Sequence, residues 1–446
     1  MNFENLYLKC PVLIQSLLIN LQGFHIKYSR YNRNFLVFLN RYTHSSPFKT
    51  DEKQLLSFLT EALKTSFWNS RFKSFEVDIS KSENIRTELQ KMPILTKQEV
   101  KDNLESIINP NLNEKISYNH TSGTTGSGLV FPQTLSMENN QWAVWWRYRK
   151  WHGIDLNTWM GWFWGRSIAN IKQTSPPFWR INYPMKQVMF SAHHLNEDTA
   201  RQYFNEINRT KISWLHGYPS QLSLLAHLIK KHNLGTLPYI KIITVGAENL
   251  LVSQKTIIEE VFNAPVRQHY GLAEGVANIS EHPDGSLIPD HDFCWMEFIP
   301  VDPENPSLCK IIGTNYNNTA FPIIRYDTGD LAQVEWLPDG SPKILSIDGR
   351  EEDYITLPNG VKLGRLDHIF KDLVDVQEAQ IYQPDIKTVI LRIVKRPNYD
   401  KNSEEETLIR ETKKRLGNDI NILIEYLDSI PKTNSGKLRF VISDVI

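Results

Sequence analysis

The sequence is poor in cysteine, has no net charge and contains no long apolar run. Its three cysteines among 446 residues, Cys10, Cys294 and Cys309, show no CxxC spacing and are too few for a disulfide framework, so we expect a cytoplasmic protein. Fifty basic residues balance fifty acidic ones, which gives no electrostatic reason to expect nucleic acid or an anionic membrane as a partner. A hydrophobic content of 41% is typical of a globular protein, and the length suggests more than one domain.

The most apolar stretch near the N-terminus, residues 12–24, is interrupted by Gln15, Asn20 and Gln22. It is too short and too polar to span a bilayer, and neither a basic segment before it nor an Ala-x-Ala site after it indicates a signal peptide. The segment is therefore predicted to form an amphipathic helix that docks on the rest of the protein.

The middle of the chain alternates between strand and helix patterns. Residues 211–216, 239–245 and 266–270 read as strands, and residues 219–232 and 253–262 read as helices, with Pro219 in a first turn and Ser253 as an N-cap. This β-α-β-α-β order predicts an α/β fold with a largely parallel sheet covered by helices. Ligands of such sheets bind at the carboxyl ends of the strands.

A loop rich in glycine and hydroxyl groups follows a predicted strand at residues 116–119. It reads His-Thr-Ser-Gly-Thr-Thr-Gly-Ser-Gly over residues 120–128. Glycines let backbone amides turn toward an anion, and the hydroxyls of Thr121, Ser122, Thr124 and Thr125 add donors. A flexible surface loop is an equally good interpretation of this segment alone. The Gly-Lys-Ser/Thr ending of a Walker loop is absent, which argues against a GTPase or kinase-like protein.

Three further motifs would complete a nucleotide site. Tyr270, at the end of a predicted strand, could lie against a purine, and Glu274 four residues later could hold Mg²⁺, a cation that prefers oxygen ligands. Asp330, on the tight turn of Arg-Tyr-Asp-Thr-Gly-Asp, could accept hydrogen bonds from two ribose hydroxyls, although an aspartate that caps its own turn is common. Lys437, in Ser-Gly-Lys near the chain end, could bring a cation to a reacting phosphate.

The C-terminal part is predicted to be a small α+β unit. The charged segment 348–354 has the composition of a link between modules, and Asn359-Gly360 between short apolar runs predicts a hairpin. Residues 388–394 and 420–427 read as strands, and residues 404–416 read as a helix.

Eight of the twelve tryptophans fall between Trp142 and Trp179. Spacings of three and four suit one face of a helix, so packing in the core is the favoured interpretation. A flat pocket for an aryl acid, or a platform for a sugar ring, is the alternative. Arg166 and Arg180 lie among these aromatic residues and could meet an anionic substrate group, but structural pairing is equally consistent.

Together, the motifs resemble those of the adenylate-forming (ANL) enzyme superfamily over residues 122–439. The matching segments are residues 121–126, 270–274, 326–330, 349–350 and 431–437. Within that superfamily, the approach Phe-Pro-Ile-Ile-Arg-Tyr at residues 321–326 is most similar to the phenylacetate–CoA ligase branch, which also holds coenzyme F390 synthetase-like and CapK-like capsule-biosynthesis proteins. Some relatives carry zinc, but His282, His291, Cys294 and Cys309 match no familiar ligand spacing.

The resemblance implies a large N-terminal domain, residues 1–349, whose first 110 residues are mainly helical, and a small mobile lid, residues 350–446. It implies ATP-dependent conversion of a carboxylic acid to an acyl-adenylate with release of pyrophosphate, and then transfer to CoA. Transfer to an amine or hydroxyl during the biosynthesis of a surface polysaccharide is the alternative, and a catalytically silent binding module is a second one. The segment 360–367 lacks the proline and glutamate expected in CoA ligases, which bears on the choice between acceptors.

The resemblance also assigns roles to residues. Thr125, Glu274 and Lys437 would be catalytic, with Glu274 on Mg²⁺ and Lys437 between the α-phosphate and the carboxylate. Glu352 would be the hinge, and Gly360 would let the pantetheine arm of CoA pass. The remaining nucleotide contacts would come from Ser122, Gly123, Thr124 and Gly126 at the β- and γ-phosphates, from Gly246, Ala247, Glu248, His269, Tyr270 and Gly271 around adenine, and from Asp330 and Arg350 at the ribose.

Overall fold

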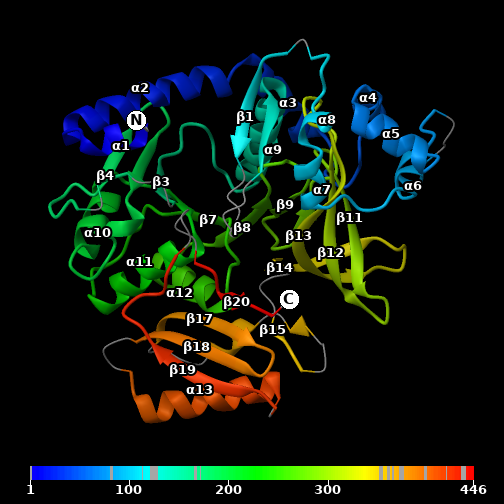
Figure 1. Ribbon diagram of the computed structural model, residues 1–446. Helices are drawn as coiled ribbons and strands as arrows, with labels where there is room; N and C mark the ends of the chain where they lie inside the picture. The colour runs from blue at the N-terminus through cyan, green and yellow to red at the C-terminus, as the bar shows by residue number, and fades with distance from the viewer. Residues whose placement is uncertain are drawn as a thin grey trace.

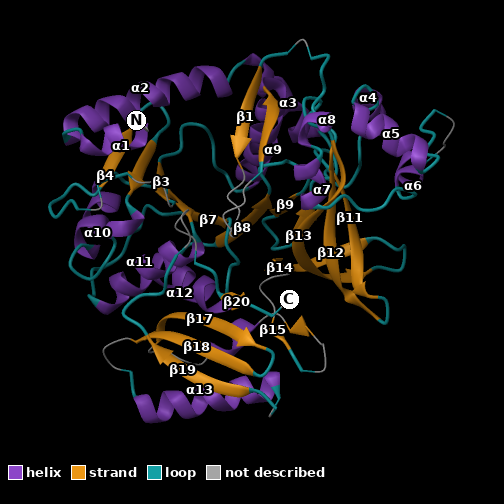
Figure 2. Ribbon diagram, in the orientation of Figure 1, coloured by secondary structure: helices purple, strands orange, loops and turns teal. Residues whose placement is uncertain are grey.

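The computed structural model shows a large mixed sheet with helices on both faces and a smaller sheet below it (Figures 1 and 2). It describes residues 3–80, 84–112, 114–120, 129–164, 168–170, 172–350, 355–358, 362–363, 366–370, 376–395, 399–417, 419–432 and 438–445. The predicted α/β class is confirmed.

The large sheet joins twelve strands of the described residues, in the order β11-β12-β13-β14-β10-β9-β8-β7-β6-β3-β5-β4. Its central strands run parallel, as the alternating pattern predicted: β5 (Gln187–Phe190), β3 (Met160–Phe163), β6 (Trp214–Gly217), β7 (Ile242–Gly246) and β8 (Val266–Gly271).

Antiparallel strands extend this centre on both sides. On one edge lies β4 (Trp179–Asn182). On the other side follow β9 (Asn278–Glu281), β10 (Leu287–Pro289), β14 (Pro342–Arg350), β13 (Ile323–Trp336), β12 (Asn305–Asn315) and β11 (Trp295–Asp302).

Helices α10 (Ala200–Arg209), α11 (Pro219–Lys231) and α12 (Val252–Phe262) bury a common apolar core against the parallel strands. Pro219 begins α11, where its missing N–H has no helical partner to lose, and Leu222, Leu225 and Ile229 form its buried stripe. The prediction of Ser253 as the N-cap of α12 is wrong. The cap position is Leu251, whose amide donates a hydrogen bond to Oε1 of Gln254 over 3.1 Å. A short 3₁₀ helix, η1 (Ala192–His194), precedes α10.

A second core joins α3 (Arg33–His44) and α9 (Leu135–Trp151) to the sheet. Thr134 caps α9 by accepting a hydrogen bond from the Met137 amide over 3.0 Å, and Arg149 and Lys150 occupy the last turn, where positive charge suits the helix dipole. This helix carries the first run of tryptophans across the sheet.

The N-terminal segment forms α1 (Phe3–Lys9) and α2 (Val12–Arg30). The predicted helix docks on β4, but it does so through its polar residues: Asn20 Nδ2 donates to the Ile181 carbonyl over 2.9 Å, and Gln15 is buried. Gly23 allows the close approach, because a Cβ there would lie 2.1 Å from Oδ1 of Asn182. The apolar side chains of Leu13, Leu17, Leu21 and Phe24 are exposed. Among the described residues, no helix combines the length and apolarity needed to cross a bilayer.

A group of short helices and a hairpin complete the first third of the chain. The helices are α4 (Glu52–Ala62), α5 (Ser66–Ser74), α6 (Ile85–Leu89), α7 (Lys97–Asp102) and α8 (Leu104–Ile107), and the hairpin pairs β1 (Ile116–His120) with β2 (Val130–Thr134). Buried Trp68 anchors this region, because its indole N–H donates to the Pro322 carbonyl over 2.9 Å.

The C-terminal elements form their own sheet, in the order β19-β18-β17-β20, with a separate apolar core (Figure 1). The elements are β15 (Ile355–Thr356), β16 (Lys362–Leu363), η3 (Leu366–Phe370), β17 (Val376–Asp385), β18 (Thr388–Lys395), α13 (Lys401–Leu416), β19 (Asn421–Tyr426) and β20 (Val441–Ser443). The predicted hairpin strands β15 and β16 pair antiparallel, while Asn359 and Gly360 lie outside the described residues. The division of the chain at residue 350 stays a prediction.

Candidate functional site

The carboxyl ends of β7 and β8 meet where the sequence predicted a nucleotide wall. Gly246 is the register partner of His269, and a Cβ on Gly246 would lie 2.8 Å from the His269 carbonyl oxygen, so only glycine permits this approach. The next residue, Ala247, has φ of 62°, a left-handed conformation that strains a side chain with a Cβ. Strand β7 ends at Gly246, and Ala247, which follows it, is exposed to solvent.

Two residues predicted to hold adenine and ribose are in direct contact. The Tyr270 hydroxyl donates a hydrogen bond to Oδ2 of Asp330 over 2.7 Å. Asp330 is 6% exposed, and its amide donates to the Thr328 hydroxyl over 3.1 Å. Arg350 is its register partner on β14, so both predicted ribose residues lie on neighbouring strands. Tyr270 and Asp330, 60 residues apart in sequence, therefore lie together. We call this pair the nucleotide corner, after the role that the sequence predicts for it.

Glu274 lies just after β8 and is 6% exposed. Its backbone carbonyl accepts a hydrogen bond from the Asn315 side chain, which ties this turn to the end of β12. In the described ranges, no group of three or more His, Cys, Asp or Glu residues could hold a metal ion. The candidate zinc residues His282, His291, Cys294 and Cys309 accordingly form no such group.

Glu248 joins the large sheet to the C-terminal segment. Its carboxylate accepts hydrogen bonds from the Ser220 amide over 3.2 Å and from the Leu438 amide over 3.0 Å. Burial raises the pKa of Glu248, and the hydrogen bonds from Leu438 and Ser220 act in the opposite direction. The segment that follows the predicted lysine loop thus reaches the edge where β7 ends, as the red trace in Figure 1 shows.

Several predicted site residues fall outside what the structure describes. These are Ser122, Gly123, Thr124, Thr125, Gly126, Arg166, Glu352, Gly360 and Lys437. For Arg350 the structure describes the backbone but not the side chain. Their roles stay predictions from the sequence.

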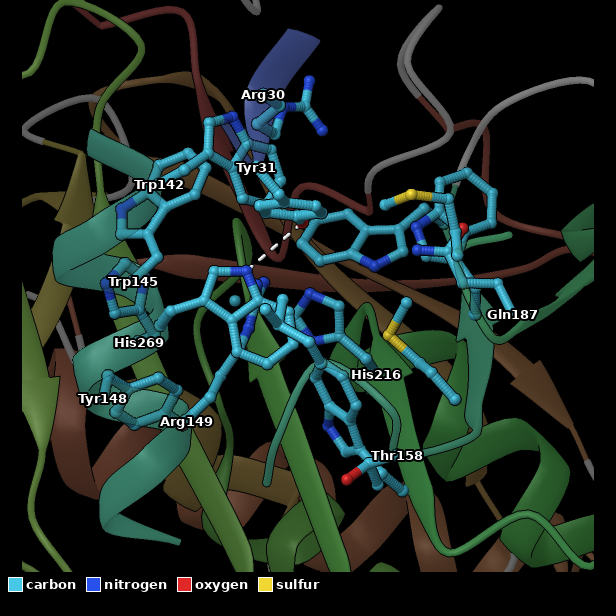
Figure 3. A pocket seen from close by; sticks show the side chains of 18 of the residues that line it. Arg30, Tyr31, Trp142, Trp145, Tyr148, Arg149, Thr158, Gln187, His216 and His269 are labelled. Carbon is cyan, nitrogen blue, oxygen red and sulfur yellow. Dashed lines mark hydrogen bonds between the residues drawn. The ribbon is translucent and has the colours of Figure 1, made fainter. Parts of the chain in front are cut away.

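A pocket of about 600 Å³ lies at the carboxyl ends of β7 and β8, where the sequence predicts one wall of a nucleotide site, which we call the nucleotide wall (Figure 3). Gly246, Ala247 and Gly271 line its edge at the carboxyl ends of the strands, and α9 covers it from one side. Eight tyrosine and tryptophan side chains line it: Tyr31, Trp142, Trp145, Trp146, Tyr148, Trp162, Trp164 and Trp214.

The prediction that the tryptophans pack in the core describes only part of what the structure shows. Trp146 and Trp214 are buried in the second core, but they and four other tryptophans also face the pocket. The sequence analysis missed Trp214, because it lies on β6, far from the dense tryptophan run. It also missed Arg149. A signal existed, since Trp142, Trp145 and Arg149 are spaced by three and four residues and so share one face of a helix.

The described residues that line the pocket include Lys27, Arg30 and Arg149 but no aspartate or glutamate. Burial lowers the pKa of Arg149 to about 10, so the guanidinium stays protonated at neutral pH. Burial and the charge of Arg149 lower the pKa of His269 to about 3 and that of His216 well below its usual value. Both histidines are therefore neutral. Arg30 is paired with Glu138 over 3.2 Å, and the positive charge of the described lining comes from Lys27 and Arg149.

Arg180, one of the two arginines considered for an anionic substrate group, has a structural role. Its Nε donates to Oε1 of Gln15 on α2 over 2.9 Å, and its Nη1 donates to the Pro177 and Trp179 carbonyls, both over 2.7 Å. It is 1% exposed and does not line the pocket. The arginine joins α2 to β4 and holds no substrate there.

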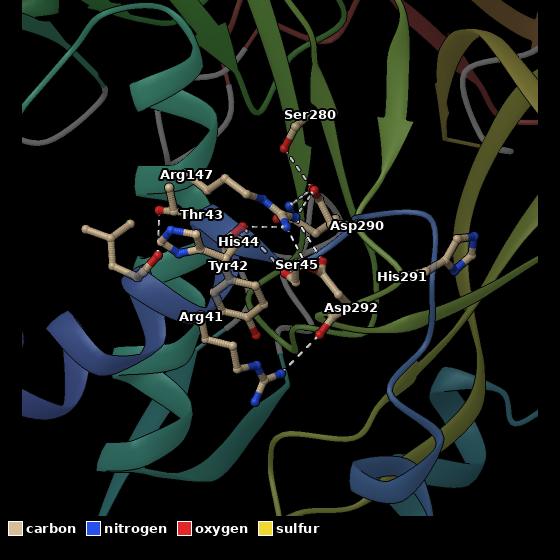
Figure 4. A network of polar contacts seen from close by, with 12 residues as sticks. Arg41, Tyr42, Thr43, His44, Ser45, Arg147, Ser280, Asp290, His291 and Asp292 are labelled. Atoms are coloured by element: carbon tan, nitrogen blue, oxygen red, sulfur yellow. Dashed lines mark hydrogen bonds and ion pairs between the residues drawn. The ribbon is translucent and has the colours of Figure 1, made fainter.

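Arg147, on the same helix as Arg149, belongs to a buried ionic network (Figure 4). It pairs with Asp290 and Asp292, and its Nη2 lies 2.9 Å from Oδ1 of Asp292. Ser280 and Asn278 donate further hydrogen bonds to Asp290. The network anchors α9 to the segment after β10 and so fixes the helix that lines the pocket.

Comparisons with known proteins agree with this architecture. Residues 357–444 match the CapK C-terminal domain family. Protein CapK of Staphylococcus aureus is 28% identical over 458 residues, which cover 99% of each chain.

Solved structures share the fold at low sequence identity. 2-Hydroxyisobutyryl-CoA ligase in the postadenylation state, in complex with 2-HIB-AMP, superposes with a TM-score of 0.66 at 16% identity over 88% of each chain. The anthranilate CoA ligase AuaEII in complex with anthranoyl-AMP gives a TM-score of 0.53 at 16% identity, over 73% of this chain and 65% of that chain. Residues 357–444 are therefore similar to the CapK C-terminal domain, the whole chain is similar to Protein CapK, and the fold is that of the two CoA ligases.

Proposed function

We propose that the protein activates a carboxylic acid with ATP, giving an acyl-adenylate and pyrophosphate. The observation that carries the proposal is the pocket itself. It is aromatic, contains three cationic side chains and no acidic ones among its described lining residues, and meets the nucleotide wall at Gly246 and Gly271. An acid bound there would lie next to the corner that Tyr270 and Asp330 form.

Donors and cations fixed in advance around the reacting phosphate supply most of the catalysis in such a reaction, because charge gathers on its oxygens in the transition state. Tyr270 would stack on adenine while its hydroxyl orients Asp330, and Asp330 with Arg350 would hold the ribose. The hydroxyls and amides of residues 122–126 would hold the β- and γ-phosphates. Lys437 would lie between the α-phosphate and the attacking carboxylate.

The family implies Mg²⁺, and Glu274 is chemically suited to it. A carboxylate is a ligand that Mg²⁺ prefers, and the ion completes its coordination with water and phosphate oxygens. Such an ion neutralises charge on the β- and γ-phosphates when it is bound. The fixed turn at Glu274, held by Asn315, would keep the carboxylate in position.

The acceptor in the second step is CoA in our first proposal, with Glu352 as the hinge and Gly360 beside the pantetheine arm. The names of the two CoA ligases that share the fold support it. The match to Protein CapK favours the alternative, in which an amine or hydroxyl of a surface polysaccharide accepts the acyl group. Product analysis with and without CoA separates these acceptors. A cytoplasmic location belongs to the same proposal.

Carboxylate-dependent exchange of pyrophosphate with ATP tests the first step. We expect exchange with at least one acid from a broad panel of ring-bearing acids, and a loss of about 10²–10³-fold in Lys437→Ala or Glu274→Gln. Arg209→Gln is the matched control, because the Arg209 side chain is exposed on α10 and does not line the pocket. No exchange with any acid would favour a silent binding module and contradict the proposal.

A further inference from the structure

Arg149 presents a buried charge to the pocket, and no described residue pairs with it. It is 8% exposed and lies on the last turn of α9 (Figure 3). Its guanidinium carbon is 4.8 Å from the ring centre of Trp146 and 5.3 Å from that of Trp214. Within the described residues, no hydrogen bond or ion pair involves this guanidinium. Indole faces attract a cation, but they do not satisfy its five directed N–H donors.

The contrast with Arg147 shows that this arrangement is specific. Two residues earlier on α9, Arg147 is also buried and is neutralised by Asp290 and Asp292. A buried charge is normally paired, since desolvation is costly. The fold thus supplies carboxylates to one arginine of the helix and, within the described chain, none to the other. Arg149 is available for an anion that arrives from outside.

Arg149 and the edge at Gly246 lie at different levels of the pocket. The acid to be activated must reach the edge at Gly246, beside the nucleotide corner. Arg149 instead lies over Trp214, whose register partner Ile242 is four residues before Gly246. The indole of Trp214 extends toward that edge, because its Nε1 donates a hydrogen bond to Oγ1 of Thr244, two residues before Gly246. At about 3.3 Å per residue, the levels of Thr244 and Gly246 are roughly 7 Å apart, which suits a ring with substituents on opposite sides.

We propose that Arg149 binds a second anionic group, so that the substrate is a ring-bearing acid with one carboxylate at the nucleotide edge and another anionic group at the deep end of the pocket. This inference rests on the proposed function and names its substrate class. The tryptophan walls stack on the ring, and the guanidinium forms charge-assisted hydrogen bonds to the distal anion. Neutral His216 and His269 line the same space without competing for that anion.

Binding in the absence of ATP tests this directly, because six tryptophans lining the pocket report occupancy by fluorescence. The probes are benzene-1,4-dicarboxylate and its neutral-tailed isostere, 4-carbamoylbenzoate. We expect the dianion to bind the unchanged protein at least about tenfold more tightly than the amide, since hydrogen bonds to charged groups are the stronger ones. Equal affinity of the two probes for the unchanged protein would overturn the proposal.

Variants locate the effect. Arg149→Gln is expected to abolish the preference for the dianion, and Arg149→Lys to keep part of it. Arg209→Gln, an exposed arginine on α10, should keep all of it. If Arg30→Gln at the pocket mouth removes the preference while Arg149→Gln leaves it intact, the proposal is wrong. Thermal melts check that each variant is folded, and the comparison of probes on the unchanged protein holds even if Arg149→Gln does not fold.

The two proposals can fail separately. Dianion-selective binding that depends on Arg149, without pyrophosphate exchange, would remove the adenylation proposal and leave the anion site. Exchange that proceeds equally well with the amide isostere, and equally in Arg149→Gln, would leave adenylation and remove the anion site.

Discussion

Tyr270 and Asp330 form the best-defined part of the candidate site. The hydroxyl of Tyr270 and Oδ2 of Asp330 are 2.7 Å apart, and the carboxylate is almost fully buried. The sequence predicted each role separately, but it could not predict their contact, because a hydrogen bond across 60 residues depends on how β8 and β13 sit in the folded sheet.

Replacing Tyr270 with phenylalanine keeps the ring and removes the hydroxyl that orients Asp330. We expect the KM for ATP to rise roughly five- to tenfold with little change in kcat, because one hydrogen bond to a charged group is lost and the stacking face remains. Steady-state kinetics measure both parameters. Tyr270→Ala, which also removes the ring, should raise KM further, and an unchanged KM in both variants would refute the adenine role.

The lowered pKa of His269 predicts how the free energy of unfolding depends on pH. Its pKa is lowered to about 3 in the fold from an ordinary value near 6.5, so the folded state binds fewer protons than the unfolded state between these values. The contribution of the neutral imidazole is complete above about pH 6.5 and is lost as pH falls toward 3, at about 1.4 kcal/mol per pH unit.

The variant His269→Phe keeps an aromatic ring beside Trp145 and Tyr148 and cannot titrate. Urea unfolding at pH 7 and pH 5.5 should show a smaller loss of stability in the variant than in the unchanged protein. If the two proteins lose the same stability, His269 is not neutral in the fold.

At the scale of elements, α9 carries two buried arginines with different surroundings: Arg147 pairs with carboxylates, and Arg149 lines the pocket. Arg147 holds it to the segment after β10 through Asp290 and Asp292 (Figure 4). Burial raises the pKa of Asp290 to about 6 even with Arg147 beside it. The arginine is therefore needed to keep this carboxylate charged near neutral pH.

Arg147→Met should lower the free energy of unfolding by about 3–5 kcal/mol, because two buried carboxylates lose their counter-charge. Chemical denaturation measures this. The triple variant R147M/D290N/D292N should recover part of the loss. Lys230→Gln, which breaks the pair of Lys230 with Glu260 in which both side chains are exposed, should change stability by no more than about 1 kcal/mol. A loss in Arg147→Met as small as that of the surface control would contradict the anchoring role.

Elements were predictable where local pattern decides them. Pro219 and the stripe of Leu222, Leu225 and Ile229 predicted α11 to within one residue at its end. α12 was predicted with the wrong cap, because Gln254 satisfies the Leu251 amide and no hydroxyl is required. The polar residues of α2 predicted that this segment does not span a bilayer, and no described helix is long and apolar enough to do so. Their burial against β4 could not be predicted without the partner strand.

At the scale of the whole molecule, Glu248 is the contact that brings the C-terminal segment to the large sheet. Leu438, directly after the predicted lysine loop, donates its amide to this carboxylate, and Asn249 donates to the Asp348 carbonyl over 2.9 Å. The sequence predicted a lysine loop and a nucleotide wall as separate motifs. The contact between Leu438 and Glu248 is a property of the tertiary structure, because 190 residues separate the two.

Hydrogen exchange at the Leu438 amide reports this contact. We expect Glu248→Ala to speed exchange there at least severalfold, because the amide loses its acceptor and opens more often. Glu259→Ala is a matched control, since Glu259 accepts a hydrogen bond from the Val266 amide over 2.9 Å and should speed exchange at Val266 only. Unchanged exchange at Leu438 in Glu248→Ala would show that the two parts are not held through this carboxylate.

The central claim is that the nucleotide corner and the tryptophan-lined pocket together make an acyl-adenylate. The most direct measurement is a single turnover with enzyme in excess over ATP, Mg²⁺ present, no CoA, and a ring-bearing diacid as substrate, with products identified by mass spectrometry. The account predicts an acyl-adenylate and pyrophosphate, formed in amounts close to the ATP supplied and greatly reduced in Lys437→Ala. ATP that stays intact with every acid, or that yields ADP instead of an adenylate, would contradict it.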